Sequence, residues 1–252
     1  MAHIVNFDVN AELVLKDIGE KGFCVVENII PMDLVLDARS EYFSSMDLNL
    51  LHASGEKFSP WNLRERPWRK LAAGSRTGSG EAYSQLLQTT YFWQDDQNFP
   101  ALSSIFNAMV SFRNSLIKVK PNYGSNLHLD NFWNACLVHH YPQGGGHMAE
   151  HIDTLFPALL SKFDIPFLQI MVTLSSRGAH FNAGGGYLKN SDGKRSYFEN
   201  YDNVGSLVLF DGSVTHGVED IDPDILLDFK SHKGRIALFV NLYANLERNI
   251  AS

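Results

Sequence analysis

The side chains best suited to chemistry are the imidazole of His151 and the carboxylate of Asp153, in the sequence His151-Ile152-Asp153. Residues i and i+2 of a β-strand point to the same face, so these two groups can converge on one metal ion. The chain holds ten histidines, and most must be structural. One further imidazole would complete a set of two nitrogen donors and one oxygen donor, which suits iron(II) and leaves three coordination positions open.

His216 is the best candidate for that second imidazole. It follows a β-rich run, residues 206–210, and a tight turn built on Asp211-Gly212-Ser213, and it opens the next β-rich run, His216–Ile221. A strand and a turn that deliver a histidine to the start of another strand would place its ring at the end of a sheet. We therefore expect His151, Asp153 and His216 to be the metal ligands.

Arg235 stands nineteen positions after His216, at the start of an otherwise apolar strand over residues 235–243. A buried guanidinium needs a partner, and a carboxylate bound through two oxygens suits it best. Asn241 has the same strand parity as Arg235, so we expect it to face the same interior and to contact substrate. An interior asparagine must be hydrogen-bonded to something.

Elements that could hold these residues follow one another from about residue 121, as short β-rich runs separated by glycine-containing turns. We expect strands over residues 135–141, 148–153, 167–174, 186–188, 206–210, 216–221 and 235–243. Such spacing favours a sandwich or barrel. The chain is thus predicted to be mainly β with flanking helices, as one domain over residues 1–252.

The first half of the chain is predicted to be a helical buttress over residues 1–120, packed on a β core over residues 121–245. The expected elements are helices at 10–21, 31–43, 83–92 and 101–117 and a strand at Phe23–Val26. Residues 54–80 are rich in Gly, Ser, Arg and Pro and are expected to form a long loop. That loop is either a surface excursion or a lid over an active site.

The ordered set resembles the Fe(II)/2-oxoglutarate-dependent dioxygenase superfamily. It comprises the H-x-D pair, a triple-glycine hairpin at 184–186, a strand ending in Phe-Asp-Gly, the distal His216 and then Gly234-Arg235. Residues 22–31 also look like the opening of phytanoyl-CoA-dioxygenase-like members. The resemblance implies a double-stranded β-helix (jelly-roll, cupin-like) core. It also implies Fe(II) as cofactor, 2-oxoglutarate and O2 as co-substrates, and Arg235 as the partner of the far carboxylate of 2-oxoglutarate.

A second H-x-D sequence, His128-Leu129-Asp130, is the alternative metal pair. We favour His151 because it follows the strand at 135–141 and a glycine loop at 144–146, which is how the family brings its first two ligands to the barrel mouth. His128 and Asp130 would otherwise form a polar turn. The interval from His216 to Arg235 exceeds that common in the family, and residues 220–233 look like a loop insertion.

Two more co-substrate contacts are implied by the resemblance, residue by residue. Tyr141 lies ten residues before His151 and matches a tyrosine that some prolyl-hydroxylase-like members use near 2-oxoglutarate. Thr173 matches a hydroxyl-bearing position that binds the distal carboxylate. Each could equally be an ordinary buried strand residue.

Composition sets limits on the partners. Hydrophobic residues make up 44% and charged residues 19%, as in a folded globular protein, and the net charge of −7 argues against nucleic acid as a partner. Cys24 and Cys136 each lie in an apolar stretch, so we expect buried thiols, consistent with the cytoplasm. The first ten residues and the hydropathy of the chain support neither secretion nor a membrane span.

The resemblance implies hydroxylation of an unactivated C–H bond, with release of succinate and CO2. The leading hypothesis for the substrate is a small polar metabolite, such as an amino acid or a natural-product intermediate, because no basic groove or peptide-binding module is evident. Two alternatives stay open: a hydroxylase of protein or peptide residues, and a β-barrel that binds a metal or ligand without turnover.

Overall fold

The computed structural model describes residues 7–46, 58–76, 82–190, 192–199 and 204–248. The α-helices are α1 (Ala11–Lys21), α2 (Met32–Met46), α3 (Pro60–Leu63), α4 (Pro100–Leu116) and α5 (Leu155–Ser161), with a short 3-10 helix at Leu246–Arg248. The strands are β1 (Phe23–Val26), β2 (Trp68–Arg76), β3 (Ala82–Phe92), β4 (Phe132–Pro142), β5 (Gly146–His151), β6 (Gln169–Thr173), β7 (Gly185–Lys189), β8 (Arg195–Tyr197), β9 (Leu207–Phe210), β10 (His216–Ile221) and β11 (Gly234–Ala244).

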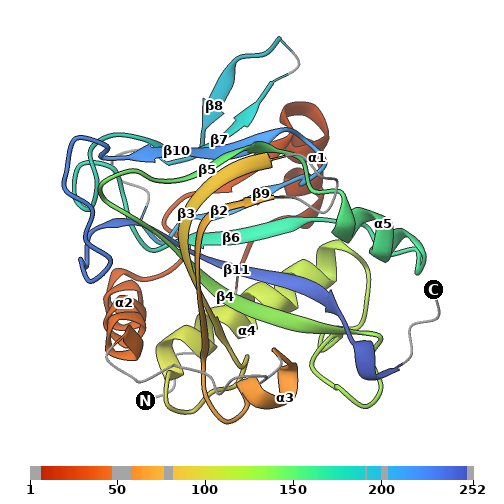
Figure 1. Cartoon of the computed structure of the whole chain (residues 1–252). Coiled ribbons are helices and arrows are strands. Elements are labelled where there is room, and N and C mark those ends of the chain that lie inside the picture. The colour runs from red at the N-terminus through yellow and green to blue at the C-terminus, as the bar shows by residue number, and fades with distance from the viewer. Residues whose placement is uncertain (1–6, 47–57, 77–81, 191, 200–203, 249–252) are drawn as a thin grey trace.

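All of these strands belong to one antiparallel sheet that curls into two layers. Its order is β1-β9-β6-β11-β4-β3-β5-β10-β7-β8, and β2 pairs with β3 outside this path. Strand β3 hydrogen-bonds to both β4 and β5 and so joins the layer β1-β9-β6-β11-β4 to the layer β5-β10-β7-β8 (Figure 1). The predicted jelly-roll core is confirmed.

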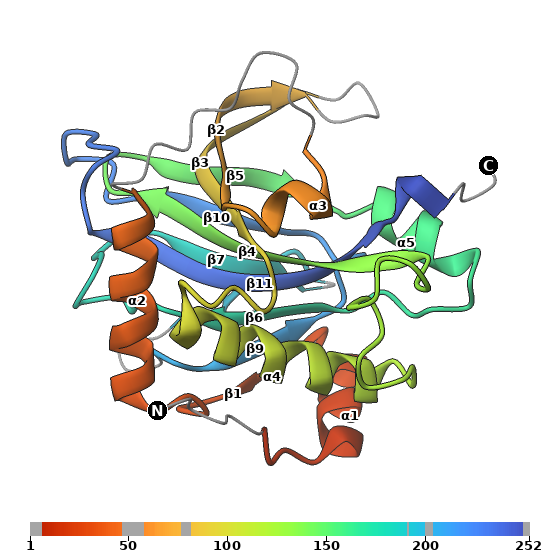
Figure 2. The same ribbon diagram turned by 90° about the horizontal axis from the view of Figure 1, so that it is seen from below.

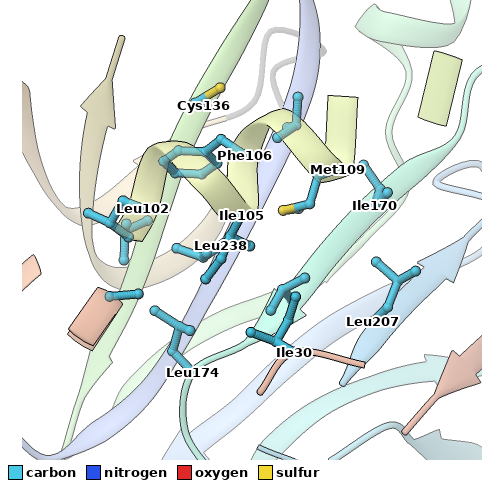
Figure 3. Packing of buried hydrophobic residues seen from close by; sticks show 14 of the residues in the cluster. Ile30, Leu102, Ile105, Phe106, Met109, Cys136, Ile170, Leu174, Leu207 and Leu238 are labelled. Carbon is cyan, nitrogen blue, oxygen red and sulfur yellow. The ribbon is translucent and has the colours of Figure 1, made fainter. Parts of the chain in front are cut away.

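Helices cover the outer face of the first layer. Figure 2 shows α4 beneath β4, β11 and β6, α1 below it next to β1, and α2 upright at one end of the strands. The residues that face the helices are apolar, even-numbered on β4, β6 and β11 and odd-numbered on β9, and Figure 3 shows some of them packed against α4. This outer core includes Cys136, Ile170, Ile236, Leu238 and Leu207. Because side chains alternate along a strand, the neighbouring residues of β4, β6 and β11 must point into the space between the layers.

Local sequence determines the boundaries of the first helix. The side chain of Asn10 accepts hydrogen bonds from the backbone N–H groups of Glu12 and Leu13, which caps the start of α1. Gly22 ends the helix in the left-handed conformation, with φ of 85°. Strand β1 follows directly and pairs with β9, so the helix is held against the sheet edge.

Two predictions for the first half of the chain are wrong. Residues 83–92 are strand β3 and not a helix, and the expected loop at 54–80 contains helix α3 and strand β2. Residues 54–57 and 77–80 of that segment lie outside the described residues. The region before residue 121 is therefore more than a helical buttress, because β1, β2 and β3 are hydrogen-bonded into the sheet.

The predicted state of the cysteines is confirmed, since Cys24 and Cys136 are both buried free thiols. Each helix in the described part of the chain is too short or too polar to cross a membrane.

Candidate metal centre

Three side chains meet where the ends of β5 and β10 lie side by side. His151 is the last residue of β5, His216 is the first of β10, and the antiparallel register places them opposite each other. One donor atom from each of His151, Asp153 and His216 lies within 4.8 Å of the others. The two imidazole centroids are 4.3 Å apart, and Nε2 of His216 lies 3.7 Å from Oδ2 of Asp153. Two nitrogens and one oxygen thus gather at one point.

Backbone carbonyls orient both imidazoles. Nδ1 of His151 lies 2.9 Å from the carbonyl oxygen of Ala149, and Nδ1 of His216 lies 2.8 Å from that of Val214. A carbonyl oxygen only accepts, so each Nδ1 donates to its carbonyl and each Nε2 is left as the ring nitrogen that can bind a metal. Metal-binding histidines are usually held in this way, with the second ring nitrogen donating to a carbonyl or carboxylate.

Asp153 is positioned from two sides. Its backbone N–H donates to the carbonyl oxygen of Gly212 at 2.9 Å, and its Oδ2 accepts from Nε2 of Gln169 at 3.0 Å. A Cβ atom at position 212 would lie 2.6 Å from that same Oδ2 and 2.2 Å from the Phe167 ring. Only glycine therefore fits at this turn, which explains the Phe-Asp-Gly sequence before His216.

The surroundings of His216 keep its imidazole in the neutral form that binds a cation. Burial and the neighbouring His151 lower the pKa of His216, and the nearby Asp153 carboxylate only partly opposes them. The imidazole is therefore neutral at neutral pH, which is the form that binds metals.

A cavity of about 430 Å³ opens beside the three ligands, between the two layers of the sheet. Among the residues that line it are Tyr141, His139, Arg235, Asn241, Gln169 and Met171. The parity argument for strand β11 holds, because Arg235, Phe239 and Asn241 all line this cavity. A space of this size fits a small molecule.

Arg235 is buried at the cavity wall, with 1% of its surface exposed. Its Nε donates to Oε1 of Glu199 at 2.6 Å, and Oε2 of Glu199 accepts from the backbone N–H of Gly186 at 2.6 Å. Nη1 of Arg235 is buried and has no hydrogen-bond partner among the described residues. Glu199 thus fixes the guanidinium by one edge and leaves a donor for another acceptor.

Close approach of the glycine hairpin makes room for Arg235. A Cβ atom at Gly186 would lie 2.8 Å from Nη2 of Arg235 and 2.8 Å from the Phe198 ring. The ring of Tyr141 lies under the guanidinium, 5.2 Å from its central carbon, and contributes a cation–π contact.

Thr173, the other expected co-substrate contact, is placed differently. It is buried, and its hydroxyl accepts a hydrogen bond from the backbone N–H of Ser206 at 3.1 Å. It is absent from the described lining of the cavity. Tyr141 and Arg235 are thus brought together at the cavity, and Thr173 is not.

The alternative pair at His128 and Asp130 forms a structural turn. The Asp130 carboxylate accepts from the backbone N–H groups of Gly124 and Asn126, and it pairs with Nζ of Lys120 at 2.7 Å. With these partners, the carboxylate stabilises the chain that leads into β4.

Sequence reasoning missed Gln169 and His139, which line the cavity, and Glu199, which pairs with Arg235. Strand parity could have found His139 and Gln169, because they share a face with Tyr141 and Met171. Burial lowers the pKa of His139 to about 3, so this histidine stays neutral. Nothing local in the sequence connects Glu199 with Arg235.

Comparisons with known proteins were made for both sequence and structure. No protein-family model and no curated protein sequence matches the chain. A prolyl hydroxylase from Trichoplax adhaerens, solved with a peptide fragment of the oxygen degradation domain of hypoxia inducible factor, superposes with a TM-score of 0.56 at 15% identity, over 96% of this chain and 92% of its own. A prolyl-4-hydroxylase from Pseudomonas putida gives 0.55 at 16% identity, over 93% and 99%.

The chain has the fold of these prolyl hydroxylases. EctD from S. alaskensis, solved with 2-oxoglutarate and 5-hydroxyectoine, is also similar, with a TM-score of 0.52 at 13% identity over 96% of this chain and 80% of EctD. The likeness spans nearly the whole chain in each case. The prolyl-hydroxylase fold therefore includes the helices before residue 121 as well as the β core.

Proposed function

We propose that the protein is an Fe(II)- and 2-oxoglutarate-dependent oxygenase that hydroxylates a small polar metabolite. The observation that carries the proposal is the meeting of His151, Asp153 and His216, with donor atoms within 4.8 Å of one another. In both histidines Nδ1 is held by a backbone carbonyl, which leaves Nε2 as the ring nitrogen that can bind a metal. Two imidazoles and one carboxylate fit iron(II) and leave coordination positions for co-substrates.

Bound iron(II), with 2-oxoglutarate and O2, would supply the oxidation of an unactivated C–H bond with release of succinate and CO2. The protein's own residues hold the three metal ligands and orient them toward one point. Gln169 fixes the Asp153 carboxylate by its hydrogen bond to Oδ2. The carbonyls of Ala149 and Val214 fix the two rings, so that the three donors need little rearrangement to bind the ion.

Arg235 supports the co-substrate assignment. Its Nη1 is a buried donor without a partner in the part of the chain that the structure describes. A carboxylate oxygen at that position would form a charge-assisted hydrogen bond. The far carboxylate of 2-oxoglutarate has this chemistry, and the Tyr141 ring beneath the guanidinium would form part of its binding pocket.

The size of the cavity supports a small substrate. About 430 Å³ must hold both the co-substrate and the reacting group, which leaves room for a compound of amino-acid size. A peptide would have to remain outside the cavity and insert only one side chain toward the iron.

Purified protein incubated with Fe(II), 2-oxoglutarate, O2 and a panel of metabolites tests the proposal by release of succinate above the substrate-free rate. We expect a small amine, amino acid or hydroxy acid to stimulate release, and His216→Ala to abolish it. Stimulation only by peptides or proteins would replace the proposed substrate class with peptide hydroxylation. No stimulation, together with tight metal and ligand binding, would favour a non-catalytic β-barrel.

A further inference from the structure

Gln169 opens strand β6 and faces the cavity with only 7% of its surface exposed. Its Nε2 donates to the Asp153 carboxylate at 3.0 Å. A carboxylate oxygen cannot donate, so the amide must present its NH2 group to Asp153 and its Oε1 to the other side. That Oε1 is buried and has no hydrogen-bond partner among the described residues.

Asn241 contributes a second acceptor on the neighbouring strand. Strands β6 and β11 are antiparallel, with Met171 opposite Phe239. Gln169 and Asn241 are the next inward-facing residues beyond this pair, and both line the cavity. Oδ1 of Asn241 is likewise buried and unpartnered within the described chain. Buried acceptors without a donor are costly, so two of them in one cavity indicate a ligand that donates.

Aromatic rings form the adjacent wall. The hydroxyls of Tyr91 and Tyr243 lie 3.4 Å apart, and Phe156 stacks on Tyr243 with centroids 5.1 Å apart. All three line the same cavity. Aromatic ring faces attract cations, and amide oxygens accept from N–H groups. An ammonium group satisfies both, since one nitrogen can donate to two acceptors while it lies against a ring.

The positive groups at the cavity do not oppose this assignment. Arg235 is neutralised by Glu199 at 2.6 Å, and Lys70, which lines the cavity from β2, is exposed to solvent. We propose that Gln169 and Asn241 form a subsite for the primary amino group of the substrate. This inference rests on the proposed function, whose substrate class it narrows to amines and free amino acids.

Binding measured without turnover tests the subsite. Protein with Fe(II) and 2-oxoglutarate is kept anaerobic and titrated calorimetrically with L-amino acids and short primary amines. Each probe is matched with the compound in which hydrogen replaces the amino group. We expect at least one amine to bind at least about tenfold more tightly than its match.

Substitutions then test whether Asn241 and Gln169 cause this difference in affinity. Asn241→Leu is expected to weaken the amine at least about tenfold and to leave its match unchanged, whereas Asn241→Asp should tighten the amine. Gln169→Leu should act like Asn241→Leu, and its iron affinity is measured separately because Gln169 contacts Asp153. Gln97→Leu, at an exposed position, is the matched control and should leave the affinities for the amine and for its matched compound unchanged.

Three results would overturn the proposed amino-group subsite. They are equal affinity for each amine and its matched compound, no binding by any probe, and an amine affinity that is unchanged in Asn241→Leu. The proposed function is judged separately, by the weak visible absorption that Fe(II) and 2-oxoglutarate together should give without any substrate. If that absorption is absent, the oxygenase proposal fails, while the amine comparison still decides whether Gln169 and Asn241 recognise an amino group.

Discussion

Glu199→Gln is the change that probes the co-substrate pocket most sharply. The side chains of Glu199 and Arg235 are each 2% exposed and lie 2.6 Å apart, so the pair is shielded from solvent. Glutamine keeps an oxygen that can accept from Nε of Arg235. It loses the negative charge, and its NH2 group would face the backbone N–H of Gly186, which now donates to the carboxylate.

The expected cost follows from this burial. Removing one partner of a buried ion pair leaves an uncompensated charge and costs about 3 kcal/mol. In a chain of this size, each kcal/mol lowers the melting temperature by roughly 2–4 °C, so the variant should melt roughly 6–12 °C lower. The co-substrate should restore much of this loss, because its far carboxylate supplies the missing negative charge beside Arg235.

Thermal unfolding with and without 2-oxoglutarate, in the presence of a divalent metal, measures both effects. The co-substrate should raise the melting temperature of Glu199→Gln more than that of the unmodified protein. Glu20→Gln is the matched control, because Glu20 is 59% exposed and lies 3.9 Å from Lys16. A melting temperature within about 2 °C of the unmodified protein, or the same response to 2-oxoglutarate in both, would refute the role of Glu199.

The remaining predictions concern the metal pair, the co-substrate and acid stability. Asp153→Ala should abolish iron binding and succinate release with the fold retained by circular dichroism. Asp130→Ala should lower stability and keep iron binding, and the reverse pattern would identify Asp130 as the ligand. Arg235→Ala should mainly raise the 2-oxoglutarate concentration needed for half-maximal rate, and an unchanged requirement would count against it. Burial lowers the pKa of His140 to about 4, so the unfolded chain binds a proton more readily than the folded one. His140 alone should account for about 2 kcal/mol of the stability lost between about pH 7.5 and about pH 5, and His140→Gln should reduce the loss by about that amount in urea unfolding; an equally steep loss in the variant would contradict this role.

Much of the β core could be predicted because strands buried on one or both faces carry local patterns. In the run from Arg235 to Asn241, the odd-numbered Arg235, Phe239 and Asn241 line the cavity and the even-numbered side chains pack in the outer core, as the alternation along a strand requires. The glycines before His216 and Arg235 mark turns where a side chain would clash.

Strand β3 could not be predicted in the same way. Its sequence mixes leucines and glutamines at helical spacing with Thr89, Thr90 and Tyr91 at its end. Its strand conformation depends on hydrogen bonds to β2, β4 and β5, which are distant in the sequence. Strand propensity depends strongly on such tertiary context.

The site, like the fold, has residues that the local sequence identifies and others that it does not. His151, Asp153 and His216 are recognisable from spacing, because β5 ends at His151, Asp153 follows two residues later, and β10 begins at His216. Glu199 lies 36 residues before Arg235 and meets it only through the hairpin of β7 and β8. Such a partner is found only when the strand order is known.

Anomalous diffraction at the iron absorption edge tests the central claim most directly, with crystals grown anaerobically in Fe(II) and 2-oxoglutarate. We predict one iron peak within bonding distance of His151, Asp153 and His216, with the far carboxylate of 2-oxoglutarate on Arg235. A peak at His128 and Asp130, or no ordered iron at the ends of β5 and β10, would contradict it.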